Sequence, residues 1–171
     1  MVLADVSESI PRSLRKAAQT RVQELVDQSR KPEDRLGIIT VAEDVSIAAK
    51  PGRESTVQIG DHSGETSGSN LAAGMRMAMS MLPEDTANRI LLISDGNETE
   101  QSLVEAAEAA VANGIPIEVM PLQYAHENEV ILDVMKMPSR VREGQSVDLR
   151  LFIRSQSSNS GTLYLWQNES P

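Results

Sequence analysis

The stretch RILLISDG at residues 89–96 places a nearly continuous apolar run directly before Asp95 and Gly96. A strand that is apolar on both faces is typical of a parallel sheet covered by helices on both sides. A second stretch, VLADVSES at residues 2–9, brings a shorter apolar run to Asp5. The two stretches together predict two buried strands, each ending at an aspartate.

Outside these two strands, apolar residues recur alternately at strand spacing and at helix spacing. Further strands are expected at residues 36–42 and 117–122, an edge hairpin at 44–59, and helices at 14–25, 71–82 and 103–111. Strands that alternate with helices predict βαβ units. The expected fold class is therefore α/β, with a doubly wound, mostly parallel sheet that carries helices on both faces.

The aromatic residues predict a domain boundary. The chain of 171 residues has only Tyr124, Phe152, Tyr164 and Trp166, so residues 1–123 have to build an aliphatic core. We expect one domain over residues 1–123, with its first strand cut short, and a different module over residues 124–171.

The second module has the alternation of half-buried antiparallel strands. Extended segments are expected at residues 130–137, 147–153 and 163–166, which makes a short C-terminal all-β segment. An immunoglobulin-like sandwich needs about 100 residues, so this segment is expected to be only the beginning of one. Because an incomplete sheet leaves an apolar face in water, we expect the tail to pack on the first domain or to form a homodimer through its strands.

Composition excludes several classes of function. The net charge is −9, from 16 basic and 25 acidic residues, which argues against nucleic acid and anionic membranes as partners. Cysteine is absent, so disulfides, thiolate metal sites and cysteine nucleophiles are excluded. No apolar run approaches the roughly 20 residues that span a bilayer, so we expect these 171 residues to be soluble.

Asp5, Ser7 and Ser9 form a D-x-S-x-S run directly after the first strand. Ligands of open doubly wound sheets bind at the carboxyl ends of the strands, where the strand order reverses. If the two aspartate-ended strands are neighbours there, Asp5 and Asp95 meet, and two such carboxylates repel each other unless a cation lies between them. Carboxylate and hydroxyl oxygens suit Mg²⁺ better than zinc or copper.

These motifs resemble the metal-ion-dependent adhesion site of the von Willebrand factor A family. That site combines a D-x-S-x-S run, a loop threonine that precedes a helix, and an aspartate followed by glycine. The middle element stands here as GSNL at residues 68–71, so Ser69 replaces the threonine and keeps its hydroxyl. The resemblance covers residues 1–123 and implies a Rossmann-like fold.

The resemblance also implies a function. Its metal ligands would be Asp5, Ser7, Ser9, Ser69 and Asp95, holding Mg²⁺, or Mn²⁺ or Ca²⁺ in its place. In the family, one coordination position is left for an acidic residue of a partner protein, which implies a non-enzymatic protein-interaction module without catalytic residues. Together with the tail, the chain is similar to bacterial multidomain membrane proteins, so the parent protein is expected to be membrane-anchored.

Two other functions stay open on the sequence. A Mg²⁺-dependent phosphatase or hydrolase could use the same crevice, although the chain has no phosphate-binding lysine loop. The second open possibility is a structural domain whose metal site is vestigial. Glu8 and Glu98 are interpreted as solvated charges beside the site, and a catalytic triad around His62 lacks the expected nucleophile motif.

Overall fold

The computed structural model describes residues 1–60, 62, 64–99, 102–123, 130–142, 144–155, 157–158 and 160–166. The chain divides into two compact units, Met1–Gln123 (unit 1) and Tyr124–Pro171 (unit 2). No helix within the described ranges is long and apolar enough to cross a membrane.

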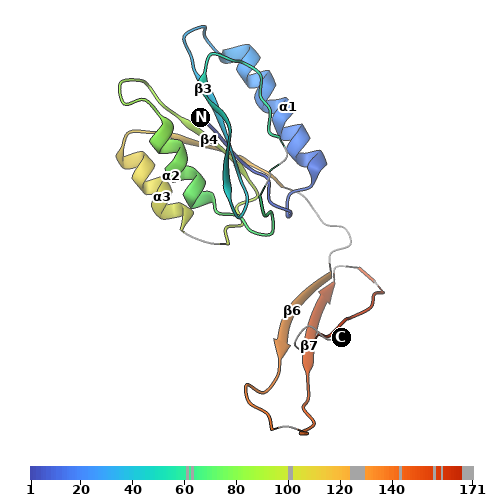
Figure 1. The fold of residues 1–171 in the computed structure, drawn as a ribbon. Helices are drawn as coiled ribbons and strands as arrows, with labels where there is room; N and C mark the ends of the chain where they lie inside the picture. The colour runs from blue at the N-terminus through green and yellow to red at the C-terminus, as the bar shows by residue number, and fades with distance from the viewer. Residues whose placement is uncertain are drawn as a thin grey trace. The chain divides into compact units, whose positions relative to one another are not determined.

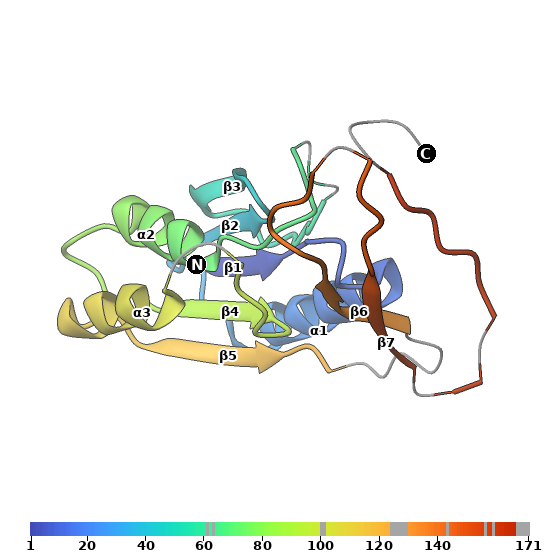
Figure 2. The ribbon, with the colours of Figure 1, turned by 90° about the horizontal axis from the view of Figure 1, so that it is seen from below.

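Unit 1 is built on a five-stranded sheet in the order β3-β2-β1-β4-β5. Its strands are β1 (Val2–Asp5), β2 (Leu36–Val41), β3 (Val45–Gly52), β4 (Ile90–Ser94) and β5 (Ile117–Pro121). All neighbouring pairs are parallel except β2 with β3. Figure 2 shows the arrowheads of β1, β4 and β5 pointing the same way. The expected doubly wound, mostly parallel α/β fold is confirmed.

The helices lie on opposite faces of this sheet. Helix α1 (Arg12–Ser29) covers one face, and α2 (Leu71–Met81) and α3 (Leu103–Ala112) cover the other (Figure 1). Helix α1 follows Pro11, whose fixed φ suits a helix start, and α3 ends before Gly114, which has a φ of +71°. Helix α1 follows β1 on one face of the sheet, and α2 precedes β4 on the other face. The strand order therefore reverses between β1 and β4.

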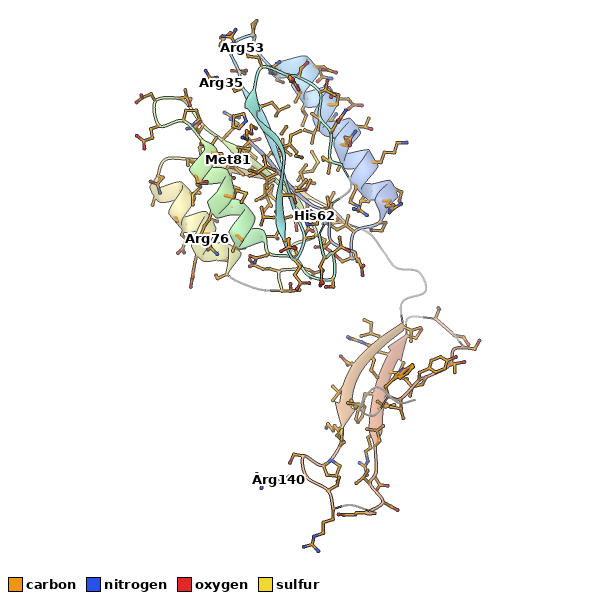
Figure 3. All side chains as sticks on the ribbon, viewed as in Figure 1. Arg35, Arg53, His62, Arg76, Met81 and Arg140 are labelled. Carbon is orange, nitrogen blue, oxygen red and sulfur yellow. The ribbon has the colours of Figure 1, made fainter. Side chains whose placement is uncertain are left out.

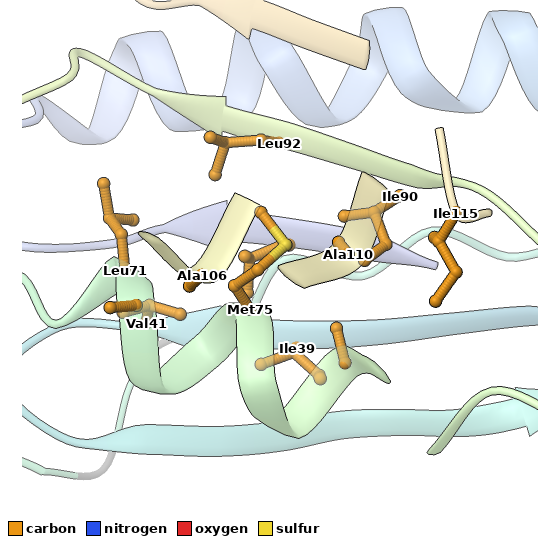
Figure 4. Close-up of a cluster of buried hydrophobic side chains, with 12 residues drawn as sticks. Ile39, Val41, Leu71, Met75, Ile90, Leu92, Ala106, Ala110 and Ile115 are labelled. Atoms are coloured by element: carbon orange, nitrogen blue, oxygen red, sulfur yellow. The ribbon is translucent and has the colours of Figure 1, made fainter. Parts of the chain in front are cut away.

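Two aliphatic cores fill the space between the sheet and the helices. The core under α2 and α3 contains Ile39, Leu71 and Met75, each with no exposed surface (Figure 4). The core under α1 contains Val2, Ile38 and other aliphatic residues. Helix α2 approaches the sheet closely at Gly74, where an added Cβ would collide with Val41 and Leu3. Unit 1 therefore buries a full layer of apolar side chains on each face of its sheet.

The prediction of an edge hairpin at residues 44–59 is wrong for the second strand, expected around Val57 and Ile59. Strand β3 pairs back onto β2, and residues 53–60 form no strand. The N–H of Val57 instead donates to the side chain of Gln23 (2.8 Å), and the N–H of Ile59 donates to Gln19 (3.0 Å). Two glutamines of α1 thus supply the acceptors that a neighbouring strand would have supplied.

Unit 2 contains a two-stranded antiparallel sheet of β6 (Val130–Lys136) and β7 (Arg150–Ser155). The third strand expected at 163–166 is not formed, since residues 160–166 have no regular structure. Apolar side chains stay exposed on both strands: Leu132 is 51% and Ile153 is 55% exposed. The interpretation as an immunoglobulin-like module stays a prediction.

Candidate metal centre

The candidate site lies where the strand order reverses. Strands β1 and β4 are parallel neighbours, with Ala4 opposite Ile93, so the ends of both strands come out at the same edge of the sheet. The next pair along this register brings Asp5 beside Ser94. This is the position where open α/β sheets bind ligands.

Asp5 is buried at 1% exposure, and both of its carboxylate oxygens accept hydrogen bonds. Oδ1 accepts from the N–H (3.0 Å) and the hydroxyl (2.7 Å) of Ser7. Oδ2 accepts from the hydroxyls of Ser69 (3.0 Å) and Ser94 (2.9 Å). These donors replace the water that burial removes from the carboxylate.

The hydroxyl protons of the site are directed inward. Ser7 Oγ lies 3.0 Å from Ser9 Oγ. Because the single hydroxyl proton of Ser7 goes to Asp5, Ser9 is the donor in this pair. Lone pairs of Ser7, Ser9 and Ser69 are then left for an electron-pair acceptor such as a cation.

Asp95 lies one residue beyond Ser94, on the loop after β4. Its carboxylate accepts from the N–H (3.0 Å) and the side-chain amide (3.1 Å) of Asn97. Ser94 accepts from the N–H of Gly96 (2.9 Å), which folds this loop back over the end of β4. The structure thus joins Asp5, Ser7, Ser9 and Ser69 by hydrogen bonds, and Asp95 reaches the group through the backbone that follows Ser94.

Ser94 is a site residue that the sequence motifs did not reveal, although the sequence contains a signal for it. It is the one polar side chain in the apolar run at residues 90–94, and it is buried at 3% exposure. A hydroxyl at the end of a buried strand needs a partner. The neighbouring strand ends at Asp5, which supplies that partner.

Glu98 is not a solvated charge, so that interpretation is wrong. Its carboxylate accepts from the N–H of Ala72 (3.1 Å) at the start of α2 and from the N–H of Leu103 at the start of α3. A carboxylate at a helix N-terminus is stabilised by the unpaired N–H groups and the helix dipole. The sequence did not reveal this role because it depends on two helices meeting.

Glu8 and Glu43 hold the loop that leads to Ser69. Glu8 accepts from the hydroxyl of Thr66 (3.0 Å), and Glu43 accepts from the hydroxyl of Ser67 (2.6 Å). Both glutamates are exposed. This end of unit 1 therefore carries negative charge, which attracts cations.

His62 takes no part in the hydrogen-bonded group around Asp5. Its Nδ1 lies 3.4 Å from the hydroxyl of Thr40 on β2. Figure 3 shows Arg35 and Arg53 at the end of unit 1 away from His62. The residues on either side of His62, Asp61 and Ser63, which a catalytic triad there would use, lie outside the described residues.

The donor set fits a hard divalent cation. It offers carboxylate and hydroxyl oxygens, which are the ligand types of Mg²⁺, Mn²⁺ and Ca²⁺. Within the part of the chain that the structure describes, no three His, Cys, Asp or Glu side chains gather where they could hold a metal. Hydroxyls therefore have to supply most of the ligands here, with Asp5 and Asp95 as the two carboxylates of the set.

Solved structures share this fold. An aerotolerance-related membrane protein from Bacteroides fragilis is 21% identical, with a TM-score of 0.65, covering 88% of this chain and 80% of that one. BatB from Bacteroides thetaiotaomicron is 21% identical, with a TM-score of 0.58, covering 91% and 79%. Proximal thread matrix protein 1 from the mussel byssus, solved with a zinc-occupied MIDAS motif, is 17% identical, with a TM-score of 0.59, covering 69% and 36%.

A search of the curated proteins finds no match. The family model for the von Willebrand factor type A domain matches residues 1–98, which is more than half of the 171 residues. That match covers β1, the D-x-S-x-S run, Ser69 and Asp95. The chain belongs to the von Willebrand factor type A domain family.

Proposed function

We propose that unit 1 is a non-enzymatic protein-interaction module that binds a divalent cation through Asp5, Ser7, Ser9, Ser69 and Asp95. The observation that supports this most is the convergence of three serine hydroxyls on the buried carboxylate of Asp5. Their protons point to Asp5, so Ser7 and Ser69 present lone pairs outward. The zinc-occupied MIDAS motif of the mussel protein, which shares this fold, supports a divalent cation as the ligand.

Each residue has a defined part in this proposal. Asp5 supplies negative charge and orients the hydroxyls, because both of its oxygens are engaged by serines. Ser7, Ser9 and Ser69 supply neutral ligands, and Asp95 supplies the second charge. A bound cation would supply an electrophilic position that a carboxylate oxygen of a partner protein can occupy.

The charge of the site makes the partner contact depend on the cation. Glu8 and Glu43 are exposed at the same end as the candidate ligands, and they repel an approaching carboxylate. An acidic partner is therefore expected to bind only when the cation is present. The similarity to a bacterial membrane protein supports a membrane-anchored parent protein for this chain.

Calorimetry with Mg²⁺, Mn²⁺, Ca²⁺ and Zn²⁺, each titrated separately, tests the metal site. Ser9→Ala removes one candidate ligand at an exposed position, and we expect its affinity to fall about 10-fold or more. Ser80→Ala is the matched control, since that hydroxyl donates to the Met77 carbonyl within helix α2. Wild-type affinity in Ser9→Ala and in Asp5→Asn would contradict the assignment.

Two further assays separate the alternatives. A peptide that contains glutamate should bind the metal-loaded protein and lose binding when a chelator is added. Metal binding without any peptide affinity would favour a vestigial site. Hydrolysis of a simple phosphomonoester in the presence of Mg²⁺ would favour the enzyme.

A further inference from the structure

Ser69 is held through its backbone by Thr99, in addition to the bond that its hydroxyl makes with Asp5. The Ser69 N–H donates to Thr99 Oγ1 (2.9 Å), and the Thr99 N–H donates to the Ser69 carbonyl (3.1 Å). The Thr99 hydroxyl also donates to that carbonyl (3.4 Å). One threonine therefore engages both backbone polar groups of a residue 30 positions away.

Glu98 ties the loop that carries Thr99 to the rest of the domain. Its two carboxylate oxygens accept from Ala72 and Leu103, at the starts of α2 and α3. Ser69 lies two residues before α2, where the next residue, Asn70, accepts from the N–H of Ala73 (3.1 Å) as the helix cap. The loop after β4 thus contacts the first turn of α2 through Glu98 and the residue Ser69, just before that helix, through Thr99.

These contacts close a ring around the candidate metal centre. Asp5 accepts from Ser69 and from Ser94. The chain runs from Ser94 through Asp95 to Thr99, and Thr99 returns to Ser69. Ser69 and Asp95, the two candidate ligands outside the D-x-S-x-S run, therefore both lie in this ring.

We propose that Thr99 is a positioning residue of the metal centre, which fixes Ser69 relative to Asp95 before a cation arrives. This inference rests on the proposed metal-binding function. Groups that are already ordered need not lose conformational freedom when the ligand binds, and this raises affinity. Thr99 is not one of the proposed metal ligands. It acts on the site through the backbone of Ser69.

Gly68 permits the close approach of Thr99. A Cβ added at Gly68 would lie 3.0 Å from Thr99 Oγ1 and 3.6 Å from the Cβ of Glu43. Gly68→Ala is therefore expected to push the threonine away from Ser69 without changing the chemistry of Thr99. It provides a second, independent variant.

The test compares Thr99→Val, which keeps the shape and loses the hydroxyl, with Thr99→Ser, which keeps the hydroxyl. In the full chain, we expect Thr99→Val to bind Mn²⁺ about 10- to 100-fold more weakly, as outer-shell substitutions commonly do. Thr99→Ser should restore wild-type affinity, and Gly68→Ala should resemble Thr99→Val. Thr86→Val is the matched control, because the Thr86 hydroxyl bonds Asn88 and Pro83 before β4.

Hydrogen exchange without metal provides a second measurement. The Ser69 amide should exchange at least about 10-fold faster in Thr99→Val than in the wild type, because its acceptor is lost. Unchanged Mn²⁺ affinity in Thr99→Val would overturn the positioning role and leave the proposed function intact. A wild type that binds no metal would overturn both. If Thr99→Val and Gly68→Ala both unfold the protein, Thr99 is a structural residue and the proposal is wrong.

Discussion

The two units bury their apolar residues to very different extents. In unit 1, Leu3 and Ile39 have no exposed surface, whereas in unit 2 Leu132 is 51% and Trp166 is 66% exposed. Both units have strands with regular patterns of apolar residues. The difference shows that strands can pair without forming a core, since a core requires a second layer of structure to cover them.

The covering layers of unit 1 have a clear source. Helices α1, α2 and α3 come from the segments between its parallel strands, so each connection also covers a face of the sheet. In unit 2, β6 and β7 form an antiparallel hairpin, and the described residues supply no third strand or helix. A two-stranded hairpin alone is marginally stable in water.

The largest effect that separates the two units is expected from truncating a leucine in each. Leu3→Ala should lower the free energy of unfolding of unit 1 by about 2–5 kcal/mol, because it leaves a cavity between β1 and α2. Leu132→Ala, at a half-exposed position, should change stability by about 0.5 kcal/mol or less. Denaturant titrations of both variants measure these changes.

The distribution of aromatic residues lets each unit be followed separately. The described helices lie in unit 1, so helical circular dichroism reports on that unit, whereas tryptophan fluorescence comes only from Trp166 in unit 2. Leu3→Ala should shift the circular dichroism transition and leave the fluorescence transition in place. Equal destabilisation by the two leucine variants would show that the comparison of the units is mistaken.

A smaller effect is expected on association. We propose that the apolar strands of unit 2 pair with a second copy of the chain, because β6 and β7 each have one edge without a partner strand among the described residues. Leu132→Lys places a charge opposite Ile153 on the neighbouring strand and should shift the chain towards monomer. Sedimentation velocity measures this, and a wild type that stays monomeric at high concentration would rule out the dimer.

The sequence predicted the parallel strands and the three helices of unit 1 because their apolar patterns are local. It failed at residues 53–60, where the N–H groups of Val57 and Ile59 find glutamines of α1. A helix side chain that replaces a strand partner leaves no periodic signal in either segment. The same limit explains the missing third strand of unit 2, since alternation shows which residues suit a strand and not whether a partner strand is present.

In the candidate site, too, residues in a local motif could be predicted and residues that act across the fold could not. Asp5, Ser7 and Ser9 stand together in the sequence, so a local motif revealed them. Ser94 and Thr99 act across the fold: one donates to Asp5 from a neighbouring strand, and the other holds the backbone of Ser69. Their roles depend on the strand order, which a single sequence does not specify.

The proposed function depends most on a cation among the serine hydroxyls at the ends of β1 and β4. A crystal of the full chain soaked in Mn²⁺ and measured for anomalous scattering locates such an ion directly. We expect a peak between the hydroxyl oxygens of Ser7, Ser9 and Ser69, and the loss of that peak in Asp5→Asn. No peak at these hydroxyls in the wild type, or an unchanged peak in Asp5→Asn, would contradict it.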